Sequence, residues 1–261
     1  MWVVTYPKCG TTWAQELVWQ VAHGLDLEGG KTDLMERFPF MEFLEWDAFG
    51  NDFNPANYKT LAQLDSVEGR RFIKTHLPLS LLPPCLLDTG KVVYVARNPR
   101  DAMVSYYHHH KLIRCHQFTG DFKTFAERFM KDQVMYSPFF QHCEEAWQLR
   151  ESPNLLFIFF EDMKKDMKSV VERVARFLGT SLTPEQVAAL VHHLDIEQFR
   201  QNAAVNKENI RSTEFLSDGS FIRKGEVGGW KEDFKSCPEM EEEFSRWISQ
   251  QMKTSTIEFS V

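Results

Sequence analysis

The residues best suited to chemistry in this 261-residue chain lie near its start, in the segment TYPKCGTTW at 5–13. An apolar run at 2–4 precedes the segment, and residues 14–22 follow with apolar positions at helical spacing. The pattern predicts a strand, a tight loop and a helix. Free backbone N–H groups and the positive end of the helix dipole then face the loop, together with Lys8 and two threonine hydroxyls. This junction is suited to bind an anion.

The position of Lys8 separates this loop from the common nucleoside triphosphate loop. That loop reads G-x-x-x-x-G-K-[ST], with the lysine directly after the second glycine. Here Lys8 precedes Gly10, the only glycine of the segment. The bound anion therefore need not be a nucleoside triphosphate. A plainer alternative is that the hydroxyls only cap the helix and face solvent.

A second chemically capable pair follows another short apolar strand, in RFIKTHLP at 71–78. Lys74 and His76 are two positions apart, so their side chains lean to the same side of an extended chain. Histidine is the side chain best matched to take a proton from a hydroxyl near neutral pH. On these residues alone, a histidine that caps the strand or bonds to a backbone carbonyl remains the alternative.

Two further segments place cations at a strand end and in a glycine-rich loop. After Lys91, the apolar run 92–96 leads to Arg97, and Pro99 fits the first turn of a following helix. Near the C-terminus, FIRKGEVGGW at 221–230 carries two adjacent cations and three glycines. Glycine permits positive φ and close approach of the backbone, so such a loop can wrap an anion. Taken alone, it would fit a solvated basic turn better than an anion-binding loop.

In this order, the four segments resemble those of the cytosolic sulfotransferases, which use 3′-phosphoadenosine 5′-phosphosulfate (PAPS). The resemblance covers nearly the whole chain and implies transfer of a sulfuryl group from PAPS to the hydroxyl of a small apolar phenol, alcohol or sterol, without a metal. It implies that His76 is the catalytic base, while Lys8 and Lys74 stabilise negative charge during transfer. The residues implied to bind the donor are Lys8, Gly10, Thr11, Thr12, Trp13, Arg97, Ser105, Phe160, Leu194, Ile196, Arg223, Lys224 and Gly225.

The resemblance also implies a division of labour around the donor. The first loop would cradle the 5′-phosphate, with Trp13 beside the adenine, and Arg97, Ser105 and the C-terminal basic loop would hold the 3′-phosphate. The segment FPFME at 38–42 resembles one wall of the acceptor site. The acceptor contacts implied there are Phe38, Phe40 and Met41, together with His76. Plain core packing of these apolar side chains is the alternative.

The chain departs from the family pattern at four places. It begins at the first strand, where relatives carry a segment that helps line the acceptor pocket. Phe160 stands where relatives often have tyrosine before Glu-Asp, and LDIE at 194–197 replaces a segment that usually holds Thr and Phe near the adenine. The Thr-Val core of the family dimer motif is missing from residues 231–240, so a homodimer is not carried over.

The elements that must position these residues alternate along the chain. Apolar runs predict strands near 2–6, 71–75, 91–97 and 155–160, and helical periodicity predicts helices near 11–23, 99–113, 121–132, 138–150, 166–178, 183–193 and 239–252. We therefore expect one α/β domain over residues 1–261, with a central parallel sheet flanked by helices on both faces and ligands beyond the carboxyl ends of the strands. The resemblance implies the P-loop-like sulfotransferase version of this fold. Residues 203–220 are polar and aperiodic, which predicts a mobile loop.

The composition argues against several other classes of protein. A net charge of −7, with no basic stripe along a predicted helix, argues against a nucleic-acid surface. The longest apolar run, at 155–160, is far shorter than the ~20 residues of a membrane-spanning helix. Five scattered cysteines with no C-x-x-C pair indicate reduced thiols in the cytoplasm. The expected partner is a small hydroxylated molecule.

A metal site is disfavoured, and two other classes of function stay open. His108, His109 and His110, with Cys115 and His116, suggest a metal site, but neighbouring residues on a helix turn by about 100° each and cannot converge on one ion. The strand at 155–160 followed by two acids resembles the end of a Walker B strand, which would indicate a Mg²⁺-dependent nucleotide phosphotransferase. The altered adenine segment leaves room for a relative that binds PAPS or its product but catalyses weakly.

Overall fold

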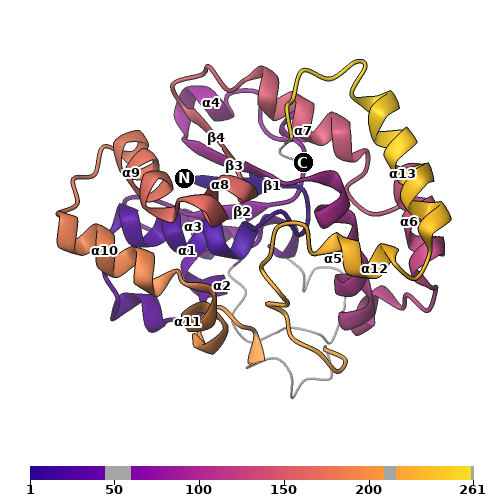
Figure 1. Cartoon of the computed structure of the whole chain (residues 1–261). Helices are drawn as coiled ribbons and strands as arrows, with labels where there is room; N and C mark the ends of the chain where they lie inside the picture. The colour runs from indigo at the N-terminus through magenta and orange to yellow at the C-terminus, as the bar shows by residue number, and fades with distance from the viewer. Residues whose placement is uncertain (45–59, 209–215, 260–261) are drawn as a thin grey trace.

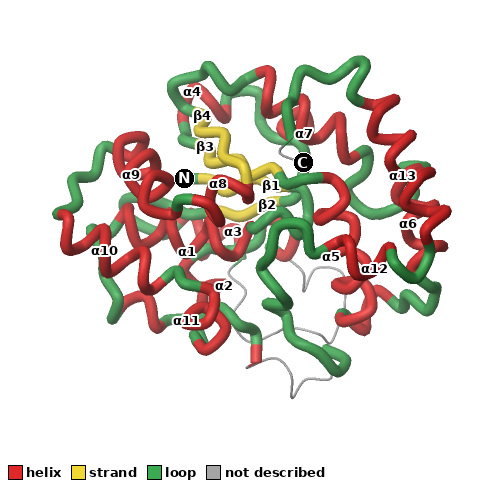
Figure 2. Tube along the Cα trace, in the orientation of Figure 1, coloured by secondary structure: helices red, strands yellow, loops and turns green. Residues whose placement is uncertain are grey.

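The fold is built on a four-stranded parallel sheet with the order β2-β1-β3-β4, in a computed structural model that describes residues 1–44, 60–208 and 216–259. Figure 2 shows the strands at the centre of the molecule, surrounded by helices. The strands are β1 (Trp2–Thr5), β2 (Ile73–Thr75), β3 (Val92–Ala96) and β4 (Leu155–Phe159). In register, Val3 lies beside Lys74 on one side and Val93 on the other. The residues that follow β1, β2 and β3 therefore meet at one edge of the sheet.

Helices cover both faces of the sheet. The longer ones are α1 (Thr11–Ala22), α5 (Pro99–Leu112), α6 (Phe122–Met130), α7 (Phe139–Gln148), α9 (Met167–Leu178), α10 (Pro184–His193) and α13 (Pro238–Gln251). The shorter ones are α2 (Leu34–Arg37), α3 (Leu61–Asp65), α4 (Leu86–Thr89), α8 (Phe160–Lys165), α11 (Ile196–Gln201) and α12 (Trp230–Phe234). In Figure 1, α1, α9 and α10 gather on one side of the sheet, and α5, α6, α7 and α13 on the other.

Two apolar cores follow from the alternation of side chains along the strands. Val3 belongs to the core shared with α1, α9 and α10, whereas its neighbour Val4 belongs to the core shared with α5, α6, α7 and α13. Strands buried on both faces read as continuous apolar runs, which is why these four were visible in the sequence. The predicted α/β class with a parallel sheet and helices on both faces is confirmed.

The polar segment 203–220 is only partly described. Ala204 and Val205, which precede residue 209, are buried in the core shared with α1, α9 and α10. This stretch is therefore packed, whereas the prediction was a mobile loop. After residue 215, Leu216 is buried against the end of α5, where it pairs with Ile113. The middle of the predicted loop, residues 209–215, lies outside the described part of the chain.

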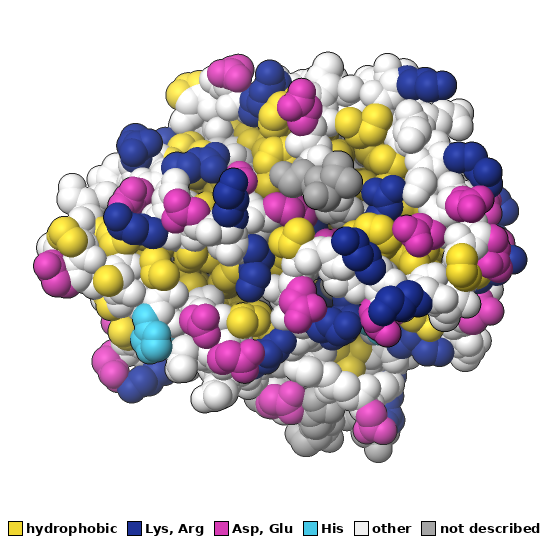
Figure 3. Space-filling view, in the orientation of Figure 1, with side chains coloured by type: hydrophobic (Ala, Val, Ile, Leu, Met, Phe, Trp, Pro, Cys, Tyr) yellow, Lys and Arg dark blue, Asp and Glu magenta, His cyan; other side chains and the backbone are white. Residues whose placement is uncertain are grey.

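The surface charges and the helix lengths bear on two classes that the sequence argued against, nucleic-acid-binding proteins and membrane-spanning proteins. In Figure 3, acidic and basic side chains lie interspersed across the face shown, without a continuous basic stripe. None of the helices in the described ranges is both long and apolar enough to cross a bilayer.

Candidate active site

A cavity of about 850 Å³ opens where the carboxyl ends of the strands meet the helices. It draws its walls from all four segments singled out in the sequence. The predicted residues that line it are Lys8, Gly10, Thr11, Thr12, Trp13, Phe40, Lys74, His76, Arg97, Ser105, Phe160, Ile196, Arg223, Lys224 and Gly225. Segments more than 200 positions apart in the chain thus share one site.

The loop between β1 and α1 needs a glycine at its turn. Gly10 adopts a φ of 98°, and a Cβ atom there would lie 2.8 Å from the ring of Phe160. Lys8 also has positive φ, at 66°, which turns its side chain into the cavity wall. The backbone N–H groups of the first turn of α1 have no intrahelical partners, and this turn borders the cavity. The loop can therefore bind an anion through both its backbone and Lys8.

His76 is held in a defined tautomer beside this loop. Its Nδ1 lies 2.9 Å from the carbonyl oxygen of Thr5, and because a carbonyl only accepts, Nδ1 must carry the proton. The Nε2 atom then keeps a lone pair and is free to accept a proton. Burial, with Lys74 nearby, holds the pKa of His76 well below its ordinary value, so the ring is neutral at pH 7. These are the properties of a general base.

Thr5 joins the base to the anion-binding turn. Its hydroxyl lies 2.6 Å from the hydroxyl of Thr11 and 3.3 Å from Nδ1 of His76. Both threonines are buried, so the two hydroxyls satisfy each other away from water. The imidazole is therefore fixed relative to the first turn of α1.

Behind His76 lies a buried hydrogen-bond chain that the sequence did not reveal. His142, on α7, donates from Nε2 to the carbonyl of His76 at 2.9 Å, and its Nδ1 lies 2.7 Å from the hydroxyl of Tyr94. On the other side, the carboxylate of Glu42 accepts from the backbone N–H of His76 at 2.7 Å. These three residues fix the backbone that carries the base. Their signal was absent because they are isolated residues inside a strand, an α-helix and a 3-10 turn.

The cavity concentrates positive charge. Burial lowers the pKa of Lys8 to about 7, with further lowering by Arg97, Lys74 and Arg223. Burial likewise lowers the pKa of Lys74 to about 8. The ammonium of Lys74 lies 4.0 Å from the centre of the Phe40 ring. Cations that repel one another in this way favour a ligand with several negative charges.

Arg97 connects the first loop to the C-terminal loop. Its guanidinium donates to the carbonyl of Lys8 at 3.1 Å and to the carbonyl of Glu226 at 2.8 Å, and it lies over the ring of Phe160 at 4.1 Å. The side chain is buried, with 7% of its surface exposed. Arg97 therefore joins the C-terminal loop to the loop between β1 and α1 through one guanidinium.

Two residues that the sequence reading missed anchor the C-terminal loop. Asp101, at the start of α5, accepts from the backbone N–H of Gly228 at 2.7 Å and from that of Trp230 at 3.0 Å. Arg200, on α11, donates to the carbonyls of Arg223 and Lys224 at 2.7 and 2.9 Å. These contacts hold the basic loop over the cavity.

An apolar slot, lined by Trp13, Phe160, Ile196 and Phe199, adjoins the loop between β1 and α1. Trp13 donates from Nε1 to the carbonyl of Leu194 at 2.8 Å, and its ring lies 5.7 Å from that of Phe160. Phe199 also lines the cavity here, so an aromatic wall exists two positions after the segment in which it was expected. Gly225 approaches Ile196 so closely that a Cβ atom would lie 2.6 Å from the Ile196 side chain.

Three of the predicted contacts need correction. Phe38 is fully buried and packs against Phe72 on the α1 side, so its ring belongs to the core and not to the cavity. Met41 packs on the other core and is also not part of the lining. The side chain of Leu194 is fully buried, and only its carbonyl serves the slot, through Trp13. In each case an apolar side chain found more buried surface in a core than at the cavity.

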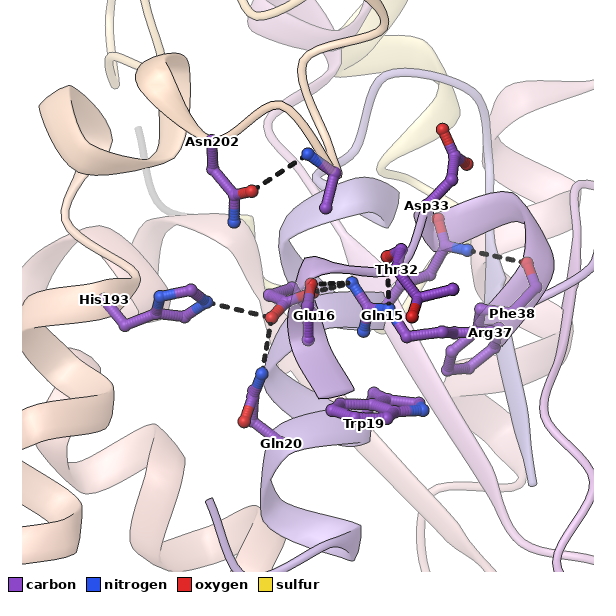
Figure 4. Close-up of polar contacts among 12 residues, drawn as sticks. Gln15, Glu16, Trp19, Gln20, Thr32, Asp33, Arg37, Phe38, His193 and Asn202 are labelled. Atoms are coloured by element: carbon purple, nitrogen blue, oxygen red, sulfur yellow. Dashed lines mark hydrogen bonds and ion pairs between the residues drawn. The ribbon is translucent and has the colours of Figure 1, made fainter. Parts of the chain in front are cut away.

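Glu16 organises a buried polar network beneath the cavity (Figure 4). Its carboxylate accepts from Arg37 at 2.7 Å, from His193 at 2.9 Å and from Gln20 at 2.9 Å. Burial alone would raise the pKa of this carboxyl, but the hydrogen bonds and Arg37 outweigh burial and lower it. Trp19 covers the Arg37 guanidinium at 4.4 Å. The network ties α1 to α2, which precedes the acceptor wall, and to α10, which precedes the apolar slot.

Removing the carboxylate of Glu16 is expected to destabilise the protein strongly. In the Glu16→Ala variant, Arg37 keeps a buried charge without its partner, which costs about 3–5 kcal/mol in the free energy of unfolding. Urea denaturation followed by circular dichroism measures this loss. The exposed pair Glu28 and Lys31 provides the control, because Glu28→Ala should change the free energy by less than ~1 kcal/mol. Equal losses in the two variants would contradict the assigned role of the network.

The histidines that suggested a metal site do not converge on one point. His108 pairs with Asp233, whereas His109 and His110 both lie beside His116. In the described residues, no group of three or more His, Cys, Asp or Glu side chains is arranged to hold a metal ion.

The acids that follow β4 are not placed as a Walker B pattern would require. Glu161 accepts from the backbone N–H of Asn98 at 2.9 Å, and Asp162 pairs with Arg173 at 3.7 Å. Neither acid is part of the cavity lining.

Comparisons with known proteins agree with the geometry of the site. Residues 1–256 match the sulfotransferase domain family. The chain is 38% identical to rat sulfotransferase 1A1 over 236 residues, covering 89% of this chain and 78% of the relative. It is 33% identical to human sulfotransferase 1E1, covering 98% and 85% of the two chains. A crystal structure of retinol dehydratase in complex with androsterone and the inactive cofactor PAP superposes with a TM-score of 0.89 and 36% identity, covering 99% of this chain and 82% of the other. The chain therefore belongs to the sulfotransferase family and is a PAPS-dependent sulfotransferase.

Proposed function

We propose that this cavity binds PAPS and transfers its sulfuryl group to the hydroxyl of a small apolar phenol, alcohol or sterol. The observation that carries the proposal is that one cavity brings together four side chains, Lys8, His76, Arg97 and Arg223. In this cavity the Nε2 atom of His76 is unprotonated. The retinol dehydratase structure, which contains androsterone and PAP, supports both the donor and the class of acceptor in this proposal.

The proposed roles follow from charge and position. His76 accepts the proton of the acceptor hydroxyl at Nε2 while the oxygen bonds to sulfur and the bond from sulfur to the bridging phosphate oxygen breaks. Lys8 and the N–H groups of the first turn of α1 stabilise the charge that develops on the departing 5′-phosphate, and Lys74 stabilises the sulfuryl oxygens. The products are a sulfate ester and 3′-phosphoadenosine 5′-phosphate (PAP).

The remaining donor contacts are assigned according to the part of the cavity that each residue lines. Gly10, Thr11 and Thr12 would bind the 5′-phosphate, and Arg97, Ser105, Arg223, Lys224 and Gly225 would bind the 3′-phosphate. The adenine would lie in the slot of Trp13, Phe160, Ile196 and Phe199. On the acceptor side, Phe40 and Tyr136 stand edge-on to His76 with ring centroids 5.3 and 5.4 Å away, which suits a flat apolar acceptor.

The function is tested by transfer of label. The protein is incubated with sulfur-labelled PAPS and a panel of phenols, sterols and long-chain alcohols, and labelled sulfate esters are counted. Transfer to at least one acceptor without added metal supports the proposal. Binding of PAP with no transfer to any acceptor would indicate a weakly catalytic relative, and activity that needs ATP and Mg²⁺ but ignores PAPS would indicate a phosphotransferase.

We expect PAP binding to be coupled to proton uptake. The pKa of Lys8 is about 7 in the free protein, and an adjacent phosphate favours the ammonium and raises that pKa. Above pH 7 the complex therefore binds more protons than its components, so PAP affinity falls as pH rises, by up to about tenfold per pH unit. Calorimetry at pH 8 in two buffers of different ionisation enthalpy should show uptake of roughly one proton or more.

The matched control for proton uptake is Lys8→Arg, whose side chain stays charged throughout this range. Its uptake should fall to the contribution of Lys74, the other lysine with a lowered pKa. Equal uptake by the two proteins would contradict the role of Lys8.

We further propose a cytoplasmic location and a small-molecule partner. All five cysteines are free, which supports a cytoplasmic protein. The acceptor partner is a small molecule. A homodimer is not proposed, because the family dimer motif is not matched in residues 231–240.

A further inference from the structure

The acceptor half of the cavity contains two histidines that the reaction as proposed does not use. His109 lies near the end of α5, and His116 ends the following 3-10 turn, Arg114–His116. Both line the cavity, and their ring centroids are 5.4 Å apart. The inference that follows rests on the proposed function and names the class of acceptor more closely.

Apolar side chains surround this pair. The ring of His109 lies 5.9 Å from that of Phe221 and 6.2 Å from that of Tyr106. Ile113 and Leu216 are buried next to them and also line the cavity. In such surroundings a polar group without a partner is costly, and a ligand that supplies the partner is favoured.

Neither imidazole has such a partner among the residues that the structure describes. Within the described residues, the rings of His109 and His116 make no hydrogen bonds, and Nδ1 of each is buried and unpaired. Burial, with Lys8 close by, holds the pKa of His109 well below its ordinary value, and burial lowers that of His116. Both rings are therefore neutral at pH 7, and each offers one N–H donor and one lone-pair acceptor.

We propose that His109 and His116 form a polar subsite that recognises a second, uncharged hydrogen-bonding group on the acceptor, such as a hydroxyl. The preferred acceptor is then an elongated apolar alcohol or phenol with one hydroxyl at His76 and a second polar group toward the end of α5. A neutral imidazole pair matches a hydroxyl, which both donates and accepts. A carboxylate fits less well, because it only accepts hydrogen bonds and leaves the lone-pair acceptor of each ring without a partner.

The experiment compares pairs of phenols that differ by one group. Each 4-(hydroxyalkyl)phenol is paired with the 4-alkylphenol that has the same number of heavy atoms, with side chains of one to four carbons before the terminal group. For each pair the ratio of kcat/KM values, hydroxyl over methyl, is measured with saturating PAPS. In the natural protein this ratio should pass through a maximum at the chain length that reaches the subsite.

Variants of His109 then identify the origin of the preference. His109→Phe keeps an aromatic ring against Phe221 and Tyr106 but removes both nitrogens, so the maximal ratio should fall by about fivefold. His109→Gln, which restores an amide donor and acceptor, should recover part of it. His108→Gln is the matched control, because His108 lies on the same helix but pairs with Asp233 outside the cavity, and its ratio should not change. PAP titration checks that each variant is folded.

Two outcomes would overturn the subsite. A natural protein with no preference for the hydroxyl member at any chain length has no such site, and an unchanged ratio in His109→Phe places the preference elsewhere. Both differ from failure of the proposed function, in which no phenol of either kind accepts the sulfuryl group.

Discussion

Replacing His76 with alanine is expected to lower kcat for sulfuryl transfer by about 10²–10⁴-fold. The variant loses the imidazole that Thr5 fixes beside the first turn of α1, with its Nε2 lone pair available. Lys8 and Lys74 still stabilise the departing phosphate, so a residual rate should remain. Single-turnover label transfer from PAPS to the best phenol of the panel measures the effect on the chemical step itself.

The His76→Ala variant should still bind the donor. Arg97 and the first turn of α1 do not depend on the imidazole for their position, so the Kd for PAP should change by less than about threefold. His192→Ala is the control for loss of a histidine, because His192 is exposed on α10 and outside the cavity lining. Near-normal turnover by His76→Ala with bound donor would refute the role of the base.

Replacing Arg97 with alanine should weaken PAP binding by about 10²-fold or more, the second large effect. Charge-assisted hydrogen bonds contribute about 1.5–3 kcal/mol each, and this guanidinium also holds the carbonyls of Lys8 and Glu226 together. If Arg97 binds the 3′-phosphate, the loss should be specific to that group. The Kd values of PAP and AMP, which lacks the 3′-phosphate, are therefore compared by calorimetry in each protein.

The expected pattern is a large preference for PAP over AMP in the natural protein and a small one in Arg97→Ala. Arg97→Lys should fall between them, because it keeps the charge but loses the fork. Arg100→Ala is the matched control: its guanidinium bonds to Ser245 and lies over Trp230, away from the cavity. A uniform loss for both nucleotides in Arg97→Ala would show that Arg97 supports the loops and does not contact the 3′-phosphate.

The strands and the longer helices were predictable because they carry unbroken apolar runs or a clear helical period. The four apolar runs became β1 to β4, because strands buried on both faces carry no polar positions to obscure them. Each helix predicted from periodicity is present within about two residues of its expected ends. Short helices such as α8 and α11 were missed, since six residues give too few turns to show a period.

The site was predictable where consecutive residues act together and not where single residues act at a distance. Lys8, Lys74, Arg97 and Arg223 were visible because each sits in a segment with its own pattern. His142, Asp101 and Arg200 were not, because each acts through a backbone group far away in the sequence. Such contacts depend on tertiary placement, which local spacing does not contain.

The segment 38–42 also shows that local sequence does not determine which side chains line the cavity. Phe38 and Phe40 are two positions apart and equally apolar, yet one packs in the core against Phe72 and the other faces the cavity beside His76. The difference arises because α2 ends at Arg37, and the backbone then turns so that Phe40 pairs with Lys74 beside the sheet. The turn that follows α2 therefore determines that Phe40, and not Phe38, faces the cavity.

A crystal structure of the protein with PAP and a phenolic acceptor tests the central claim most directly. The account predicts the 5′-phosphate at the N–H groups that open α1, the 3′-phosphate against Arg97, and the phenol oxygen within hydrogen-bond distance of Nε2 of His76. A complex with PAP bound away from the first loop, or with the phenol oxygen out of reach of that imidazole, would contradict it.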